Sequence, residues 1–217
     1  MSNQGYYGNQ ETYGYSRQPE YTNVLQILFD ERISDERKAF LKKCYSERTN
    51  HPNDSGYDLI MPDDSEHTVN TRHRVGLGIK CRMLTNGVPS PFDIQTRSSF
   101  DNYPFVMSNP PALIDVGYRG EVAVSFRCVQ DDNVVFVNGI PEQKKDNFKL
   151  IDGKITVPAG ARLFQAVHAN RKPITLEFVS TFDEARTSRD GGGFGSTTKQ
   201  PEFSTESRQF TSRSFIN

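Results

Sequence analysis

The stretch RVGLGIKCRML, residues 74–84, places an apolar side chain at every second position. Successive side chains of an extended chain point to opposite sides, so this spacing predicts a strand with one apolar face. That face would consist of Val75, Leu77, Ile79, Cys81 and Met83. The same alternation returns along much of the chain and therefore decides the fold class.

Further short stretches predict strands in the same way, namely TNVLQILF (22–29), FDIQT (92–96), EVAVSF (121–126), RLFQAV (162–167) and TLEFVS (175–180). KLIDGKITV (149–157) holds Asp152-Gly153 between two alternating runs, a strong signal for a tight hairpin. Many short strands separated by glycine and proline, with little helix, predict an all-β sandwich or jelly-roll-like β-barrel.

One stretch departs from the strand pattern. SDERKAFLKKCYSER, residues 34–48, offers Ser34 as a helix cap and acidic residues in the first turn. At helical spacing it builds one apolar face from Phe40, Leu41, Cys44 and Tyr45. We therefore expect one short extra helix packed on the β-structure.

The periodic pattern occupies the middle of the 217-residue chain, and we expect one core domain over residues 21–182. Residues 1–20 are rich in Gly, Tyr, Gln and Asn and lack aliphatic side chains, so we expect a disordered tail. Residues 183–217 have no core-building pattern and contain the glycine-rich stretch RDGGGFGST (189–197), which predicts a flexible arm and tail.

Composition narrows the function classes. The formal net charge of −1 gives no overall positive field for nucleic acid or an anionic membrane, and no apolar segment approaches the length of a membrane span. Cys44, Cys81 and Cys128 are odd in number and widely spaced, which favours free thiols in a reducing compartment, cytoplasmic or nuclear. The four histidines are scattered, so no protein-built metal cage is expected.

Five stretches could carry chemistry: SGYDL (55–59), TRSSF (96–100), LIDVGYRGEV (113–122), GARLFQ (160–165) and RDGGGFGST (189–197). Each also has a structural interpretation. Asp58 could be a turn carboxylate, the residues from Arg97 a polar strand end, and the glycine run a linker. Together, arginines, hydroxyls and glycine-rich amides are the donors that hold a polyphosphate. Asp115 could act as a general base for water, and Tyr118 could stack on a sugar or a base.

These five stretches, in this order, resemble the five motifs of the trimeric dUTP pyrophosphatases (dUTPases), over a span from about Val24 to Thr198. Asn109 lies six residues before Asp115, where the family carries an asparagine. The resemblance implies a jelly-roll β-barrel assembled as a homotrimer with three sites at subunit interfaces. It also implies hydrolysis of dUTP to dUMP and pyrophosphate.

The resemblance implies a role for each matching residue. Asp115 would activate the water that attacks the α-phosphorus. Tyr118 would pack under deoxyribose and exclude a 2′-hydroxyl, and backbone around Leu113 and Ile114, with Asn109, would read uracil. The implied phosphate holders, from a neighbouring subunit, are Arg97, Ser98, Ser99 and Gln165.

The resemblance also implies an arm that closes over the nucleotide, formed by Arg189, Phe194, Gly195 and Ser196. Phe194 would stack on uracil and Arg189 would grip the γ-phosphate. Mg²⁺ would be the cofactor, held chiefly by the triphosphate and water and by no protein cage. Asp58 would order that region without being a direct ligand.

The chain departs from the family pattern at Thr96, where proline is usual, at Ala112, where glycine is usual, and at Asp190, where a small residue is usual. The segment 127–157 and the helical region before His51 are longer than the family pattern requires. Two alternatives stay open: a dCTP deaminase on the same fold, or a non-catalytic trimer. A deaminase would need a glutamate ten residues after Asp115, where this chain has Ser125.

Overall fold

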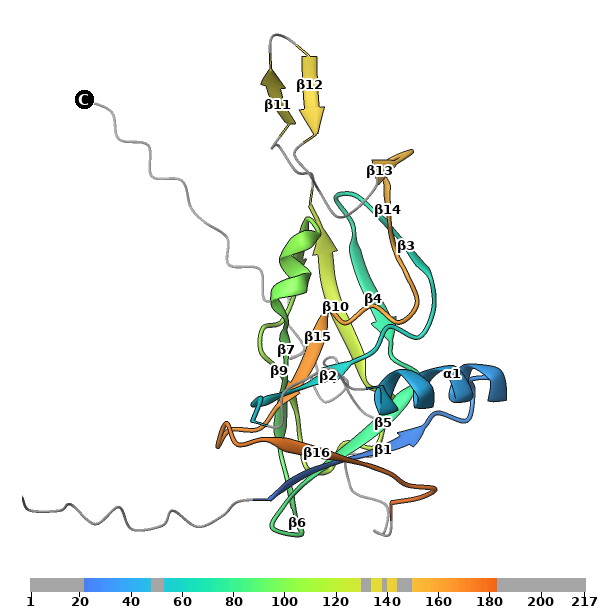
Figure 1. Ribbon diagram of the computed structural model, residues 1–217, viewed down its shortest axis with the longest axis vertical. Coiled ribbons are helices and arrows are strands. Elements are labelled where there is room, and N and C mark those ends of the chain that lie inside the picture. The colour runs from blue at the N-terminus through green and yellow to red at the C-terminus, as the bar shows by residue number, and fades with distance from the viewer. Residues whose placement is uncertain (1–21, 48–52, 130–133, 138–139, 144–149, 183–217) are drawn as a thin grey trace, which may run out of the picture.

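The computed structural model describes residues 22–47, 53–129, 134–137, 140–143 and 150–182 (Figure 1). The described part is mostly β-structure, as predicted, with one α-helix, α1 (Asp35–Ser46), and one 3-10 turn, η1 (Ser98–Asn102). The strands are β1 (Asn23–Phe29), β2 (Gly56–Leu59), β3 (Ser65–Thr68), β4 (Arg72–Gly76), β5 (Ile79–Thr85), β6 (Val88–Ser90), β7 (Phe92–Thr96), β8 (Phe105–Met107), β9 (Ala112–Ile114), β10 (Ala123–Cys128), β11 (Val134–Val137), β12 (Ile140–Gln143), β13 (Leu150–Ile151), β14 (Lys154–Val157), β15 (Phe164–Val167) and β16 (Ile174–Phe178).

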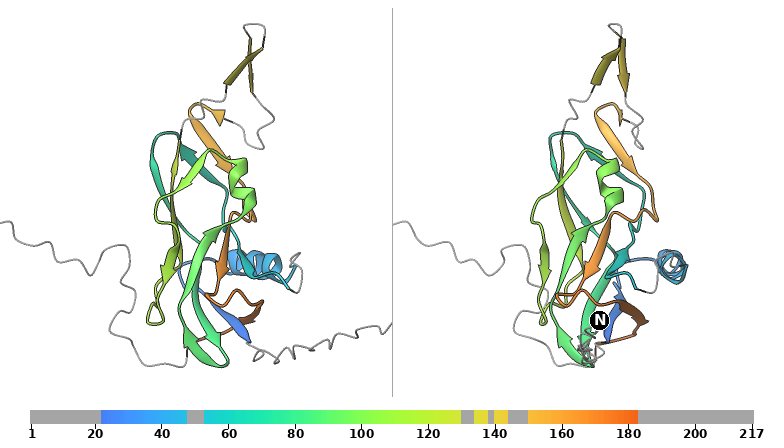
Figure 2. Two further views of the ribbon diagram at one scale, coloured as in Figure 1. Left: turned by 90° about the vertical axis from the view of Figure 1, so that its left-hand side faces the viewer. Right: turned by 60° about the vertical axis from the view of Figure 1, so that its left-hand side comes forward.

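The strands pair into five sheets, with the orders β16-β1-β5-β6, β4-β10-β8, β11-β12, β13-β14-β3 and β2-β15-β7-β9. β1 runs parallel to β16 and antiparallel to β5, so the two ends of the described core lie side by side. Figure 2 shows β1 (blue) and β16 (brown) at one end of the body and the β13–β14 hairpin (light orange) toward the other. Among the described strands no sheet closes on itself, and a closed barrel remains a prediction.

The prediction of a single strand over residues 74–84 is wrong in one respect, because the structure divides this stretch between β4 and β5. The break falls at Gly78, whose φ of 67° lies in the left-handed region that glycine adopts without strain. β4 pairs with β10, whereas β5 pairs with β1. Leu77, Ile79 and Met83 are buried as expected, so the alternation holds through the bend.

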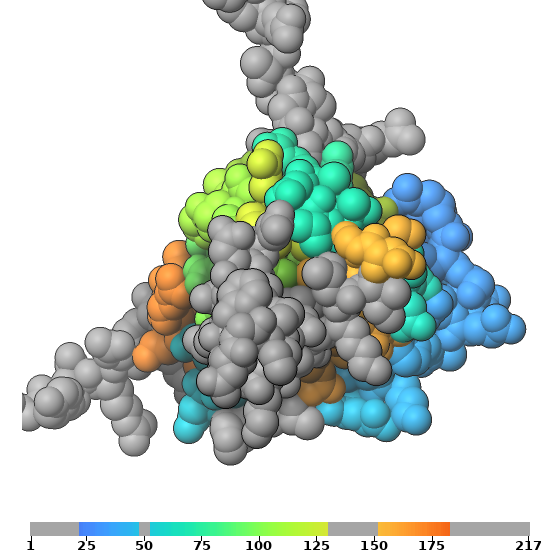
Figure 3. Space-filling model, turned by 90° about the horizontal axis from the view of Figure 1, so that it is seen from above, coloured from blue at the N-terminus to red at the C-terminus, as the bar shows by residue number. Residues whose placement is uncertain are grey.

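The predicted helix and hairpin are both present. The Ser34 side chain accepts a hydrogen bond from the backbone N–H of Arg37, the contact expected of a helix N-cap. Leu41 and Tyr45 are buried beneath α1, which lies on one side of the body, in blue in Figure 3. Asp152 and Gly153, with φ values of 51° and 71°, form the tight turn between β13 and β14.

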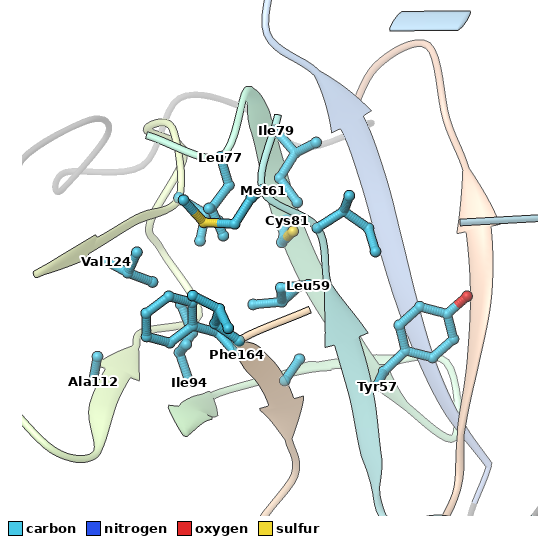
Figure 4. Packing of buried hydrophobic residues seen from close by; sticks show 14 of the residues in the cluster. Tyr57, Leu59, Met61, Leu77, Ile79, Cys81, Ile94, Ala112, Val124 and Phe164 are labelled. Carbon is cyan, nitrogen blue, oxygen red and sulfur yellow. The ribbon is translucent and has the colours of Figure 1, made fainter. Parts of the chain in front are cut away.

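The core is continuous from the α1 side to the sheet β2-β15-β7-β9 (Figure 4). Phe164 of β15 and Ile94 of β7 are fully buried at its centre, beside Leu59 of β2. Burial of side chains of this size contributes about 1.5–3 kcal/mol each, which fixes the inner face of this sheet. The predicted thiols Cys44, Cys81 and Cys128 are free. In the part of the chain that the structure describes, no helix is long and apolar enough to cross a membrane.

Candidate active site

A polar cleft of about 310 Å³ lies against the outer face of β2, β15 and β7. Side chains alternate along these strands, so Ile94 and Phe164 enter the core while Gln95 and Gln165 face outward. The buried inner face therefore determines which residues the outer face presents. The cleft is lined by Asp54, Ser55, Gly56, Asp58, Gln95, Arg97, Gln165, Val167 and Arg171.

The centre of the cleft is an ion pair between two predicted motifs. Arg97 follows β7, and its Nε lies 2.8 Å from Oδ1 of Asp58 on β2. The Asp58 side chain is 7% exposed and that of Arg97 is 30% exposed. The interpretation of Asp58 as a turn carboxylate is wrong, since it lies within a strand and pairs with a distant arginine. Apart from this ion pair, neither buried Asp58 oxygen has a hydrogen-bond partner among the described residues.

Gln165 lies between these two strands. It is opposite Asp58 on β2 and Gln95 on β7, and its side-chain amide donates to the carbonyl of Thr96 at 3.1 Å. Gln165 packs directly against Gly56, since a Cβ on residue 56 would lie 1.9 Å from Gln165 Oε1 and would displace that side chain. The SGYDL and GARLFQ stretches therefore lie on paired strands and contact each other directly.

The predicted hydroxyls follow Arg97 in the 3-10 turn η1. Ser99 donates to the carbonyl of Arg162, which also accepts from Arg97 Nη1 at 3.1 Å, and Ser98 is exposed. The Arg162 guanidinium in turn donates to the carbonyls of Cys44 and Glu47 at the end of α1. The extra helix thus supports the end of the cleft at which Arg97 lies.

Asp115 lies elsewhere, in a turn that follows β9. The Tyr118 N–H donates to the Asp115 carbonyl at 3.0 Å, which closes the turn. The Tyr118 hydroxyl donates to the Glu121 carbonyl at 2.7 Å. Residue 120 must be small, since a Cβ on Gly120 would lie 2.6 Å from the Tyr118 oxygen. The half-buried ring is thereby held against its own turn.

The other residues predicted around the base lie on β9 and in the connection that precedes it. Ile114 pairs with Phe92 at one end of β7, and Leu113 is 58% exposed next to it. Asn109 is exposed in the connection between β8 and β9. These positions place Leu113, Ile114, Asp115 and Tyr118 around one turn at the surface, whereas Asn109 precedes the other end of β9.

The two regions lie at opposite ends of β7. Asp115 follows the residue paired with Phe92, whereas Arg97 follows Thr96 at the other end. About six residues at roughly 3.3 Å each separate the two positions, or about 20 Å along the strand. Asp115 is not among the described residues that line the cleft, and within one chain it lies far from Arg97.

The predicted arm residues Arg189, Phe194, Gly195 and Ser196 lie outside the described residues. Within the described ranges, no group of three or more His, Cys, Asp or Glu side chains is arranged to hold a metal ion. Sequence reasoning missed Gln95 and Arg171 as cleft residues. Gln95 was detectable, because it shares a strand face with Arg97, but Arg171 belongs to a loop whose position only the fold determines.

No family model matches the chain. The deoxyuridine 5'-triphosphate nucleotidohydrolase of Helicobacter pylori is 31% identical over 144 residues, which cover 66% of this chain and 81% of that protein. The enzyme of the same name from Crocosphaera subtropica is 28% identical over 157 residues, which cover 72% of this chain and 92% of that protein. A solved structure of Staphylococcus bacteriophage 80alpha dUTPase with dUPNHPP gives a TM-score of 0.45 at 20% identity, covering 82% of this chain and all of that one.

Proposed function

The chain belongs to the dUTPase family, and from that membership we propose that it hydrolyses dUTP to dUMP and pyrophosphate. The observation that carries the proposal is the division of the matched motifs into two surface regions. One region offers a polar cleft whose arginines, Arg97 and Arg171, could bind a polyphosphate. The other offers a carboxylate beside a tyrosine ring, suited to a water nucleophile and a sugar.

Asp115 is the proposed general base. Its carboxylate takes a proton from water while the water oxygen forms a bond to the α-phosphorus. The bond from that phosphorus to the oxygen bridging to the β-phosphate breaks, and pyrophosphate leaves with the electron pair. The turn hydrogen bond from Tyr118 N–H to the Asp115 carbonyl supports this role, because it holds the backbone of the base in place.

The nucleoside is proposed to bind at the same turn. The Tyr118 ring would lie against the deoxyribose, so that a 2′-hydroxyl would clash or remain unpaired. Backbone groups around Leu113 and Ile114, with the exposed Asn109 side chain, would bind the uracil edge. The exposure of Leu113 on β9 supports this assignment, because it leaves the backbone of this short strand near the surface, where a base could approach it.

The triphosphate is proposed to bind in the cleft of a neighbouring subunit, at Arg97, Ser98, Ser99 and Gln165. The distance of about 20 Å along β7 supports an intersubunit site, because a single chain does not join its own base to its own phosphate holders. A jelly-roll β-barrel assembled as a homotrimer would satisfy this requirement three times.

The arm is proposed to complete the site from the C-terminal segment. Arg189 would bind the γ-phosphate, Phe194 would stack on uracil, and Gly195 and Ser196 would supply donors to the phosphates. An arm that closes over the nucleotide would exclude water and hold the triphosphate in line for attack.

Mg²⁺ is the proposed cofactor, held mainly by the triphosphate and by water. The cleft could accommodate such a hydrated ion beside Asp54, which lines it. Asp58 would order the site through its ion pair with Arg97, because its own oxygens are buried. When bound, the ion neutralises charge on the phosphates.

The direct test replaces the base. Asp115→Asn should retain binding of a non-hydrolysable dUTP analogue and lower kcat by about 10²–10⁴, the range for loss of a general base. Binding measured by calorimetry and turnover measured by pyrophosphate release separate the two effects. Near-normal turnover in Asp115→Asn would remove Asp115 from the mechanism.

A further inference from the structure

A charged cluster outside the cleft joins the Tyr118 turn to the segment that precedes α1. The cluster consists of Asp30, Arg32 and Glu121, and we call it the brace. Arg32 binds Asp30 through two contacts, Nε to Oδ1 at 2.7 Å and Nη2 to Oδ2 at 3.0 Å. The same Nη2 donates to Glu121 Oε2 at 2.6 Å. Arg32 therefore bridges two carboxylates that lie far apart in the sequence.

Asp30 is a fixed anchor for this arginine. It is 1% exposed, and its backbone N–H donates to the Gly78 carbonyl at 2.9 Å. The hydrogen bond from Arg32 lowers the pKa of the Asp30 carboxyl, so the anchor keeps its negative charge at neutral pH. A bidentate arginine–carboxylate pair also restricts the direction of the guanidinium.

Glu121 is held at both of its carboxylate oxygens. Oε2 accepts from Arg32, and Oε1 accepts from the Gly78 N–H at 2.9 Å. The side chain lies so close to β4 that a Cβ on Gly76 would come within 2.2 Å of Oε1. Rotation of the Glu121 side chain would therefore break two hydrogen bonds. These two bonds restrict the side chain and, through it, the position of the Glu121 backbone.

The backbone of Glu121 in turn holds Tyr118. The Glu121 carbonyl accepts the Tyr118 hydroxyl at 2.7 Å, and the ring lies directly over Gly120. The ring is thus linked through Glu121 to Arg32, and through Arg32 to Asp30. Neither Asp30 nor Arg32 belongs to the five stretches that define the active site.

We propose that Arg32 is a positioning residue for sugar selectivity, which acts through Glu121 to hold the Tyr118 ring where it rejects a ribonucleotide. The inference rests on the proposed function, since it assigns a new residue to the same site. It gives the segment before the extra helix a role in the reaction, at a position where the chain departs from the family pattern.

The test compares kcat/KM for dUTP with kcat/KM for UTP in the unaltered full-length protein and in variants. In Arg32→Ala the dUTP/UTP ratio should fall by roughly 3- to 30-fold, below the ~10²-fold that a displacement of about 1 Å can cost. Arg32→Lys keeps the positive charge but lacks the two-pronged guanidinium. Its dUTP/UTP ratio should therefore lie between that of the unaltered protein and that of Arg32→Ala. A melting temperature for each variant reports any general loss of stability.

Lys80→Ala is the matched control. Lys80 also contacts the anchor, with Nζ 3.9 Å from Asp30 Oδ2 and 2.9 Å from Glu31 Oε2. Among the described residues it makes no ion pair with Glu121. A loss of surface charge near Asp30 would affect both variants, whereas the brace predicts an unchanged ratio in Lys80→Ala. An equal fall in both variants would overturn the proposal.

A second substitution tests the path through Glu121. Glu121→Gln keeps an acceptor for Gly78 but weakens the pair with Arg32, so it should lower the ratio, and the double variant should fall no further than Arg32→Ala. If Arg32→Ala does not fold, Glu121→Gln alone decides the question. A ratio unchanged in the folded variants, while the unaltered protein hydrolyses dUTP selectively, would overturn this inference alone. No hydrolysis of dUTP by the unaltered protein would overturn the proposed function and this inference together.

Discussion

His67 makes the stability of the fold depend on pH. The ring is 2% exposed and lies in an aromatic cluster, with its centroid 4.9 Å from that of Phe126 and 5.5 Å from that of Phe105. Its Nε2 lies 2.9 Å from Ser65 Oγ, while its buried Nδ1 has no hydrogen-bond partner among the described residues. In a protonated ring the N–H at Nδ1 would therefore have neither a protein acceptor among these residues nor a water to bind.

The sign of the effect follows from the pKa. Burial, with a smaller contribution from His73, lowers the pKa of His67 from 6.5 to about 4. The unfolded chain then binds the proton more readily than the folded chain. The contribution of neutral His67 to the free energy of unfolding is therefore fully present above pH 6.5 and is lost as the pH falls toward 4. This difference in pKa corresponds to about 2 kcal/mol lost between pH 7 and pH 5, and to about 3 kcal/mol below pH 4.

Urea unfolding at pH 7, 6 and 5 measures this loss, with His67→Gln as the matched variant. Glutamine keeps a polar group toward Ser65 but does not titrate. It should cost stability equally at every pH, so the unaltered protein should lose about 2 kcal/mol more than the variant on going from pH 7 to pH 5. Parallel pH profiles for the two proteins would refute the assignment, because His67 would then carry no part of the acid sensitivity.

Three further predictions concern the site. Tyr118→Ala should admit UTP while retaining dUTP hydrolysis, and a kcat/KM ratio equal to that of the parent would show that the ring is only structural. Asp58→Asn should leave Arg97 without its counter-charge and lower the free energy of unfolding by about 1–3 kcal/mol, as measured in urea; an unchanged midpoint would contradict the importance of the ion pair. The Asp115→Asn protein can be mixed with a truncation after Arg186, dissociated and reassembled, and activity should return if the arm acts on another subunit's site. An inactive mixture with proven mixed trimers would exclude an arm that acts on another subunit.

The local elements of the fold could be predicted because each depends on neighbours in the sequence. The cap at Ser34, the turn at Asp152 and Gly153 and the alternation along β7 are all determined within a few residues. The parallel pairing of β1 with β16 joins residues about 150 positions apart, and local periodicity contains no information about it. The break at Gly78 was missed because the apolar alternation continues through it.

The site was predictable as a set of residues but not as an arrangement. Motif spacing identifies Arg97 and Asp115, but only the pairing of β7 with β9 places them at opposite ends of one strand. Asp58 was assigned to a turn because the sequence does not show that β15 lies between β2 and β7 and brings it to Arg97. The brace was not anticipated, since Asp30 and Arg32 have no motif around them.

The most direct test of the central claim is pyrophosphate release by the purified full-length protein with Mg²⁺ and each of dUTP, dTTP, dCTP and UTP. We expect release from dUTP and strong rejection of the other three. The proposed uracil site around Leu113 and Ile114 would leave no room for the methyl group of thymine and would not match the edge of cytosine, and the Tyr118 ring would exclude a 2′-hydroxyl. No release from dUTP would contradict the account, as would ammonia released from dCTP, which would instead indicate a deaminase.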